Sequence, residues 1–348
     1  MGKLRVVQWT TGRVGTKALE ALIDRDEFEL VGLYAYSPEK VGQDAGALCG
    51  RPDCGVVATS DAEALIALAP DAVLYTPFMA DLDHVERLLR AGINVVSTNL
   101  FLNCGGMAGE TRERVEAACD AGKSSIYVTG VNPGWVNSVA AALTAVCRRV
   151  DSVSIAESTD VSNYASKETW DAMGMGRMQA DEAVVAVAQG AMVSFRDAAL
   201  RVTDAMDLAL DDLAFEIDFA RVGQDIDLGF MVLPKGSHGA LRSAWVGTSG
   251  GLERIRVSVA WYLTDELVEN WSFDKEHYRL GVKGDPDIDC RIEFVAPDWR
   301  DSDWSVLTAL PAVNAVAKVV AGRAGILGLE DIGLITTPFH QRSADSHI

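Results

Sequence analysis

The chain has 348 residues, of which 49% are hydrophobic and 23% are charged, and its formal net charge is −19. This length and composition indicate a globular protein with room for two domains. The negative charge opposes binding to nucleic acid or to an anionic membrane surface, and the apolar stretches are too short to span a bilayer, so we expect neither as a partner.

The N-terminal sequence and the cysteines bear on the cellular compartment. The N-terminus lacks the basic head and the apolar run of a signal peptide. The six cysteines form no CxxC pair and no cysteine–histidine cluster. We therefore expect a cytoplasmic protein with reduced thiols and no bound metal.

The first part of the chain alternates between apolar runs typical of strands and amphipathic runs typical of helices. The predicted strands lie at about residues 6–9, 29–37, 71–77, 93–99 and 124–130, and the predicted helices at about 13–23, 61–69, 81–92 and 109–122. Because these strands are apolar on both faces, the alternation predicts a parallel sheet covered by helices. We assign residues 1–135 to an α/β Rossmann domain.

Beyond about Asp151 the pattern changes to a period of two. Apolar and polar residues alternate in the runs 213–222 and 254–261, and two further runs, 278–282 and 288–294, flank a turn-forming KGDPD. This pattern predicts an antiparallel sheet with one covered face, within an α+β domain over residues 136–304. The second face must be covered by helices or by another subunit, so we expect a two-fold homodimer through this domain.

A last helical stretch begins near residue 305. We expect the segment 305–348 to pack back onto the first domain and complete it.

The turn after the first strand has the spacing T-x-G-x-x-G, with Thr10, Gly12 and Gly15. It follows a strand, opens a helix and lies in a βαβ unit of the length typical of dinucleotide binding, although a plain structural turn is the alternative. Arg13 at the start of a helix is unfavourable against the helix dipole unless an anion lies nearby; otherwise it is an ordinary surface arginine. The residues predicted to bind the pyrophosphate are Thr10, Thr11, Gly12, Arg13, Val14 and Gly15.

The end of the second strand decides which dinucleotide is preferred. NAD-selective sites place a carboxylate there, whereas this chain has Tyr36 and Ser37, with Lys40 one turn later. A hydroxyl and an ammonium suit a 2′-phosphate, although Glu39 competes as a ligand of the ribose. We therefore predict NADP as the cofactor, with NAD as the alternative.

Several stretches of this chain resemble the dihydrodipicolinate-reductase-like superfamily, in the branch that contains 2,4-diaminopentanoate dehydrogenase and the native amine dehydrogenases. They are VVQWTTGRVG, ELVGLYAYSPEKVGQDAG, GINVVSTN, VTGVNPGW and PAVNAVAKVVAG followed by GILGLEDI. The resemblance implies a Rossmann domain joined to an α+β domain and a homodimer. It also implies NAD(P)-linked exchange between a ketone plus ammonia and a primary amine.

One position departs from the amine dehydrogenases of this branch. Those enzymes carry a glutamate just after the strand that here ends in STN, and that glutamate activates ammonia. This chain has Leu100 and Phe101 at the corresponding places. An apolar side chain cannot polarise ammonia, so either another acid reaches the site or the chemistry differs.

Ligands of open α/β sheets bind beyond the carboxyl ends of the strands, which directs attention to the loops after Thr76, Thr98 and Gly130. The segment that begins the second domain closes over the substrate in the family and offers further candidates, although a solvated loop with a core tryptophan is the alternative. We predict catalytic roles for Tyr164, Asn99, Asp160 and Glu168. Thr76, Pro77 and Asn132 are further predicted cofactor contacts, and Leu100, Phe101, Asn103, Trp170 and Met173 are predicted to line the substrate pocket.

These features predict an NAD(P)-dependent dehydrogenase or reductase that acts on a small, mainly apolar substrate. Amine dehydrogenase-like chemistry is the first hypothesis. A carbonyl or imine reductase that does not use ammonia is the second, and a non-catalytic NADP-sensing protein is the third.

Overall fold

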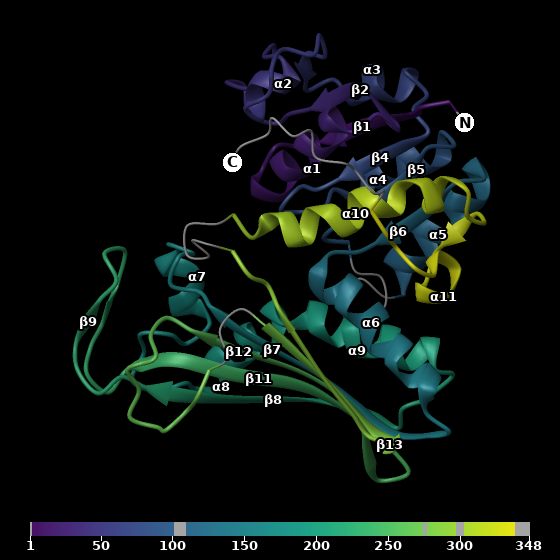
Figure 1. Cartoon of the computed structure of the whole chain (residues 1–348). Helices are drawn as coiled ribbons and strands as arrows, with labels where there is room; N and C mark the ends of the chain where they lie inside the picture. The colour runs from purple at the N-terminus through teal and green to yellow at the C-terminus, as the bar shows by residue number, and fades with distance from the viewer. Residues whose placement is uncertain (1, 101–108, 274–276, 297–302, 338–348) are drawn as a thin grey trace, which may run out of the picture. The chain divides into compact units, whose positions relative to one another are not determined.

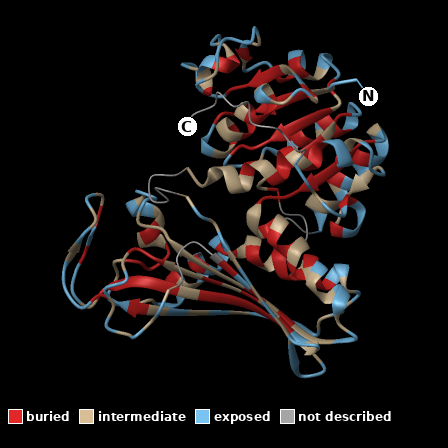
Figure 2. Ribbon diagram, viewed as in Figure 1, coloured by how far each residue is buried: buried red, intermediate tan, exposed pale blue. Residues whose placement is uncertain are grey.

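The computed structural model describes residues 2–100, 109–273, 277–296 and 303–337. The chain divides into two compact units: the first comprises Met1–Leu100, Glu113–Gly130 and Ser305–Ile348, and the second is formed mainly by Val131–Trp304. The break after Gly130 lies five residues before the boundary predicted from the sequence. Figures 1 and 2 show the two units, each of which contains a sheet.

The first unit is built on a seven-stranded parallel sheet in the order β15-β6-β5-β4-β1-β2-β3. The central strands are buried (Figure 2), in agreement with their apolar sequences. The strand order reverses between β1 and β4, as in Rossmann folds. The strands are β1 (Leu4–Trp9), β2 (Phe28–Tyr34), β3 (Ala58–Thr59), β4 (Ala72–Tyr75), β5 (Asn94–Ser97), β6 (Ser125–Val128) and β15 (Gly325–Ile326).

The helices of the first unit follow the predicted alternation. Helix α10 contacts α1 and the strands β4, β5 and β6, so the chain returns to this unit after the second unit. Its buried face joins the core around Val6, Leu74 and Tyr127. The helices are α1 (Arg13–Asp24), α2 (Ala45–Leu48), α3 (Ala62–Ala67), α4 (Leu82–Arg90), α5 (Glu110–Gly122), α10 (Ser305–Val320) and α11 (Leu329–Ile332).

The second unit is built on a six-stranded sheet in the order β14-β13-β7-β12-β11-β8. This sheet is mixed, because β7 and β12 run parallel while the other neighbours run antiparallel. The prediction of a purely antiparallel sheet is therefore wrong for the pair β7 and β12. The strands are β7 (Arg149–Asp160), β8 (Asp212–Arg221), β11 (His238–Ser249), β12 (Leu252–Tyr262), β13 (His277–Asp285) and β14 (Ile288–Glu293), and a separate pair is formed by β9 (Ile226–Asp227) and β10 (Val232–Leu233).

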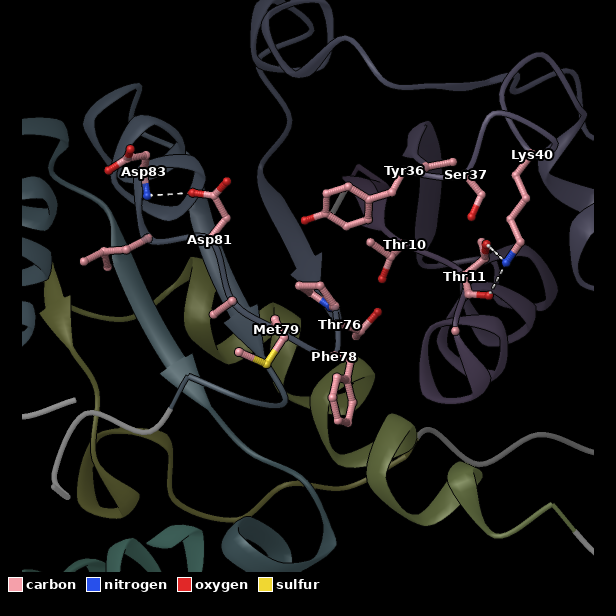
Figure 3. A pocket seen from close by; sticks show the side chains of 15 residues that line it. Thr10, Thr11, Tyr36, Ser37, Lys40, Thr76, Phe78, Met79, Asp81 and Asp83 are labelled. Carbon is pink, nitrogen blue, oxygen red and sulfur yellow. Dashed lines mark hydrogen bonds between the residues drawn. The ribbon is translucent and has the colours of Figure 1, made fainter. Parts of the chain in front are cut away.

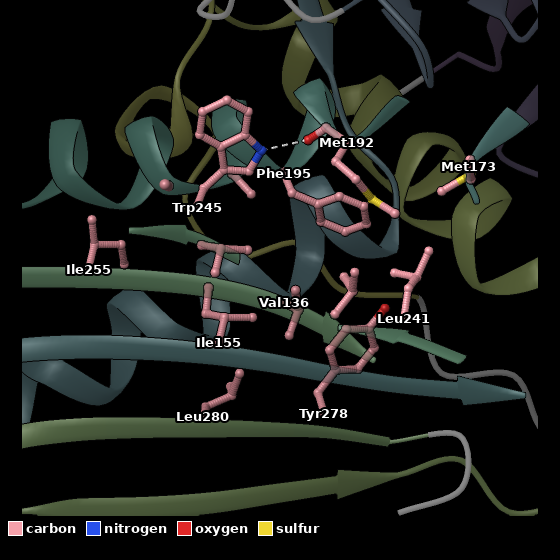
Figure 4. Packing of buried hydrophobic residues seen from close by; sticks show 14 of the residues in the cluster. Val136, Ile155, Met173, Met192, Phe195, Leu241, Trp245, Ile255, Tyr278 and Leu280 are labelled. Atoms are coloured by element: carbon pink, nitrogen blue, oxygen red, sulfur yellow. Dashed lines mark hydrogen bonds between the residues drawn. The ribbon is translucent and has the colours of Figure 1, made fainter. Parts of the chain in front are cut away.

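One face of this sheet packs against helices. Helix α9 contacts β11 and β12, and α6 contacts β7 and β13. The core between them contains Ile155, Phe195, Trp245 and Tyr278, and the Trp245 indole N–H donates to the Met192 carbonyl at 2.8 Å (Figure 4). The remaining segments are η2 (Val131–Trp135), α6 (Val136–Leu143), η3 (Thr144–Val146), α7 (Lys167–Ala172), α8 (Glu182–Ala191) and α9 (Val193–Ala205).

No single described helix is both long enough and apolar enough to cross a membrane. The bent pair α8 and α9 reaches that length and apolarity only when the two helices are taken together.

Candidate active site

The first unit contains a cavity of about 840 Å³ where three parallel strands end (Figure 3). Its lining comes from the segments that follow β1, β2 and β4, on both sides of the point where the strand order reverses. This is where open α/β sheets bind their ligands. The cavity brings together eight predicted cofactor contacts: Thr10, Thr11, Gly12, Tyr36, Ser37, Lys40, Thr76 and Pro77.

Thr10 occupies the position of the first glycine in the dinucleotide-binding turn. Its φ of +76° lies in the left-handed region that glycine adopts most readily. The buried side chain of Gln8 donates to the Thr10 carbonyl at 2.9 Å and to the Thr76 hydroxyl at 2.8 Å, and the Thr10 N–H donates to the Tyr34 carbonyl. These hydrogen bonds to residues of the neighbouring strands hold the turn in its glycine-like conformation.

The two glycines of the turn have different surroundings. A Cβ atom on Gly15 would lie 2.4 Å from the Thr10 carbonyl oxygen and 2.7 Å from the Thr76 hydroxyl, so the protein itself requires glycine there. A Cβ atom on Gly12 would meet no protein atom within 4 Å. The open space beside Gly12 is where a pyrophosphate approaches the backbone in this type of turn.

The start of α1 is suited to an anion. Asp61 and Asp81 cap the N-termini of α3 and α4 with their side chains. The cap residue of α1 is Gly12, which offers no side-chain hydrogen bond, and the first turn has no acidic residue and begins with Arg13. Backbone N–H groups at such a start are available to a phosphate.

Lys40 reaches back from the segment after β2 to the glycine turn. Its ammonium donates to the Thr11 carbonyl at 3.0 Å and to the Thr11 hydroxyl at 3.1 Å (Figure 3). Glu39, the competing ribose ligand, is exposed and does not line the cavity. The acidic residues in the lining are instead Asp81 and Asp83 at the start of α4.

The predicted residues at the ends of β4 and β5 also lie in the first unit. The Asn99 side-chain amide donates to the Pro77 carbonyl, and its oxygen accepts from the Ser97 hydroxyl at 3.3 Å. Leu100, one of the two residues expected at the place of the family glutamate, is 1% exposed. Phe101 and Asn103 lie outside the described residues, and the roles of Asn99 and Leu100 stay predictions.

Five predicted residues lie around the start of α7 in the second unit. Tyr164 is 43% exposed, and its carbonyl accepts from the Trp170 indole N–H at 2.7 Å. Trp170 and Met173 belong to the buried core, at 3% and 4% exposure. Glu168 is exposed on α7, and Asp160 accepts from the Ser162 N–H at 2.9 Å. Because Trp170 is buried in the core, the structure favours a packing role for this residue over a place in the wall of the substrate pocket.

A carboxylate that sequence analysis did not single out lies at the centre of a polar cluster in the second unit. Glu157 on β7 accepts three hydrogen bonds: from the Trp261 indole at 3.0 Å, from the Tyr278 hydroxyl at 2.9 Å and from the Asn132 amide at 3.1 Å. Asn132 was predicted to contact the cofactor, and here its amide group has Glu157 as its partner. We call Asn132, Glu157, Trp261 and Tyr278 the Glu157 cluster.

The alternating pattern of β7 marks Glu157 as an unusual residue. In β7, Val153, Ile155 and Glu157 alternate onto the same face of the sheet, and the first two are buried in the core. A carboxylate in an otherwise apolar row is informative, since such groups are seldom buried without a partner. The sequence pattern alone does not predict β7 as a strand, and without that strand the position of Glu157 is not evident.

Comparison with known proteins agrees with this structure. Residues 6–124 match the family model described as dihydrodipicolinate reductase, N-terminus. An amine dehydrogenase from Streptomyces virginiae is 27% identical over 95% of this chain and 96% of its own length. A 4-hydroxy-tetrahydrodipicolinate reductase from Bordetella parapertussis is 35% identical over 99 residues, which are 28% of this chain and 36% of the reductase. The solved structure of amine dehydrogenase from Mycobacterium smegmatis matches with a TM-score of 0.74 at 17% identity, covering 96% of this chain and 97% of that one.

These matches confirm the resemblance to the dihydrodipicolinate-reductase-like superfamily and the predicted fold class. The fold, the glycine turn and the relatives together place the chain among the NAD(P)-dependent dehydrogenases. Within that class, its similarity to an amine dehydrogenase extends over nearly the whole chain.

Proposed function

We propose that the protein is an amine dehydrogenase-like enzyme. It interconverts a small apolar ketone or aldehyde plus ammonia and the corresponding primary amine by hydride transfer. The observation that carries this proposal is the similarity to the amine dehydrogenase of Streptomyces virginiae, which spans both units and not the nucleotide-binding part alone.

The residues of the first unit fit a dinucleotide, and they favour NADP over NAD. The open space at Gly12 and the uncapped start of α1 suit a pyrophosphate. Ser37 and Lys40 line the same cavity and can bind a 2′-phosphate. When bound, the nicotinamide supplies the hydride chemistry, so the protein itself has to orient the substrate and transfer protons.

A second function is favoured by one observation. The resemblance implies that Leu100 and Phe101 stand where the family has the glutamate that activates ammonia, and Leu100 is buried. An enzyme without that acid can still reduce a ketone or a preformed imine with a weak donor such as Tyr164 or Asn99. A non-catalytic NADP sensor is the third possibility.

We also propose a homodimer that forms through the six-stranded sheet, and a cytoplasmic location. Helices α6 and α9 cover one face of that sheet. On the other face, Glu216 and Arg256 form an ion pair at 2.7 Å, so a partner subunit there would meet a partly polar surface. Light scattering at micromolar concentration tests this assembly, and a monomer would refute it.

The test of the function is an NADPH-oxidation screen of small ketones and aldehydes, run with and without ammonium. Turnover that requires ammonium, with a primary amine as the product, supports the amine dehydrogenase. Ammonium-independent turnover to an alcohol supports the reductase. Tight NADPH binding without any turnover supports the sensor.

A further inference from the structure

The Glu157 cluster places a carboxylate on the helix-covered face of the second sheet. Across the sheet, Glu157 lies between Tyr278 on β13 and Val259 on β12, and the adjacent row is Leu280, Ile155 and Val257. Those five neighbours are all buried hydrophobic or aromatic residues of the core. Glu157 itself is only partly buried, so this acid lies at the edge of the apolar face rather than deep within it.

The negative charge of Glu157 is held by neutral groups. Its partners among the described residues are an indole, a phenol and a carboxamide, and no cationic side chain pairs with it there. By contrast, the surface carboxylates Glu216 and Glu253 are both paired with Arg256. The three neutral donors of Glu157 leave this carboxylate without a cationic partner among the described residues, so a cationic ligand would complement it.

The other groups of the cluster also suit a small cation. The amide oxygen of Asn132 is buried and has no hydrogen-bond partner in the described part of the chain. Trp261 and Tyr278 direct their N–H and O–H groups at the carboxylate and hold it in one orientation. An ammonium has N–H donors and no acceptor, so the oxygens of Glu157 and Asn132 complement it.

We propose that Glu157 binds the amino group of the substrate and exchanges a proton with it, in the role left open by Leu100. This assignment rests on the proposed amine dehydrogenase function. Tyr278, Trp261 and Asn132 are positioning residues that hold the carboxylate. The site takes a primary alkylammonium with an apolar substituent.

The proton step balances in the oxidative direction. The primary alkylammonium transfers one proton to the Glu157 carboxylate and becomes the neutral amine. A bound oxidised nicotinamide would supply the acceptor for the hydride: the C–H bond on the carbon that bears the nitrogen would break, the hydride would leave with both electrons, and the nitrogen lone pair would form the C=N bond. Water adds to the resulting iminium cation of the substrate, and ammonium and the ketone are released.

A binding experiment without nucleotide tests the assignment separately from turnover. The affinity of the whole protein for sec-butylammonium is compared with that for butan-2-ol by calorimetry at fixed ionic strength. We expect the native protein to prefer the ammonium, and Glu157→Gln to lower the ammonium affinity by about tenfold while leaving the alcohol unchanged. Glu293→Gln, which removes an exposed charge from the same sheet, is the matched control and should keep the preference.

A second measurement on the native sequence keeps the assignment testable if Glu157→Gln does not fold. With 5-fluorotryptophan labelling, the Trp261 resonance, identified through Trp261→Phe, should shift with sec-butylammonium and not with butan-2-ol. An unmoved Trp261 signal at saturating ammonium, or a Glu157→Gln protein that keeps its preference, overturns the proposal.

The outcomes separate this inference from the proposed function. Ammonium-dependent turnover that Glu157→Gln leaves intact would retain the function and refute the role of Glu157. Selective ammonium binding at Glu157 without ammonium-dependent turnover would retain the binding site and refute the function.

Discussion

The two candidate sites of this protein are made in different ways and present opposite chemistry. The turn of the first unit uses residues that follow one another, Thr10 to Gly15, and offers backbone N–H groups together with Lys40. The Glu157 cluster joins Glu157 to residues 25 to 121 positions away in the chain and offers carboxylate and amide oxygens. The first suits an anion and the second suits a cation.

The difference teaches how each site tolerates change. In the turn, most of the binding capacity belongs to the backbone, so only substitutions that alter backbone geometry or fill space should remove it. In the Glu157 cluster one side chain carries the charge, and the other three hold it in place. Replacing the one charged side chain by its amide should therefore remove the function of the second site, whereas the first site should lose its function only when a substitution fills space or alters the backbone.

The largest expected effect is on ammonium-dependent turnover. Glu157→Gln should lower kcat by about 10²–10⁴-fold, the usual contribution of a general acid or base. Tyr164→Phe, Asp160→Asn and Glu168→Gln, measured in parallel with and without ammonium, test the residues predicted from the sequence. A comparable loss in one of these three, with Glu157→Gln active, would place the acid elsewhere.

The next effect separates the two glycines of the turn. Gly15→Ala should destabilise the protein by about 1–3 kcal/mol and abolish nucleotide binding, because the added methyl group overlaps backbone atoms. Gly12→Ala should leave the free energy of unfolding within about 0.5 kcal/mol of the native value, yet weaken NADPH binding by filling the space beside α1. Chemical denaturation and fluorescence titration measure the two quantities. Equal NADPH affinity in Gly12→Ala and the native protein would place the pyrophosphate elsewhere.

A smaller effect is expected on the affinity that the protein gains from the 2′-phosphate of NADPH. Lys40→Ala should weaken NADPH binding by about 1–2 kcal/mol, the value of one charge-assisted hydrogen bond, and change NADH binding much less. Lys17→Ala is the matched control, because Lys17 is paired with Glu20 on α1 and does not line the cavity. If both nucleotides lose affinity equally, Lys40 does not recognise the extra phosphate.

The smallest effect concerns the stability of the second unit. His238 is buried, stacks on Phe219 and hydrogen-bonds through Nδ1 to the Gly174 carbonyl at 2.9 Å. Burial lowers the pKa of His238 below its ordinary value of 6.5. Below pH 6.5 the unfolded chain therefore binds a proton that the folded chain does not, and stability falls as the pH falls from 6.5 toward the folded pKa.

His238→Gln should reduce this slope, since an amide can still donate to Gly174 but does not titrate. The measurement is the free energy of unfolding between pH 5 and pH 7.5. An unchanged slope in the variant would assign the pH dependence to other groups.

The first unit could be predicted well because its signals are local. Its parallel strands are apolar on both faces and its helices are amphipathic, so each element is evident from a short window of sequence. In the second unit, β8 and β12 were predicted for the same reason: Phe215, Ile217 and Phe219 alternate with charged residues.

Two strands of the second unit could not be predicted in this way. In β7, Glu157 interrupts the apolar row, while serine and alanine on the other face weaken the contrast. Strand β11 is buried along most of its length and mixes Ser243 and Gly247 with large residues, so no period of two remains. The Glu157 cluster depends on the pairing of β7 with β12 and β13, and sequence spacing does not encode that pairing.

The start of α1 has no side-chain cap and no acidic residue, but it belongs to a strongly acidic protein. This combination affects the rate at which a dinucleotide associates. The protein carries a net charge of −19, so an anionic dinucleotide approaching from a distance is repelled before it reaches the donors of the turn. Salt at about 0.1 M screens charges beyond about 10 Å, which weakens the distant repulsion more than the close contacts at the turn. The association rate of NADPH should therefore rise with moderate ionic strength, the reverse of what is seen where the net charge of a protein attracts its ligand.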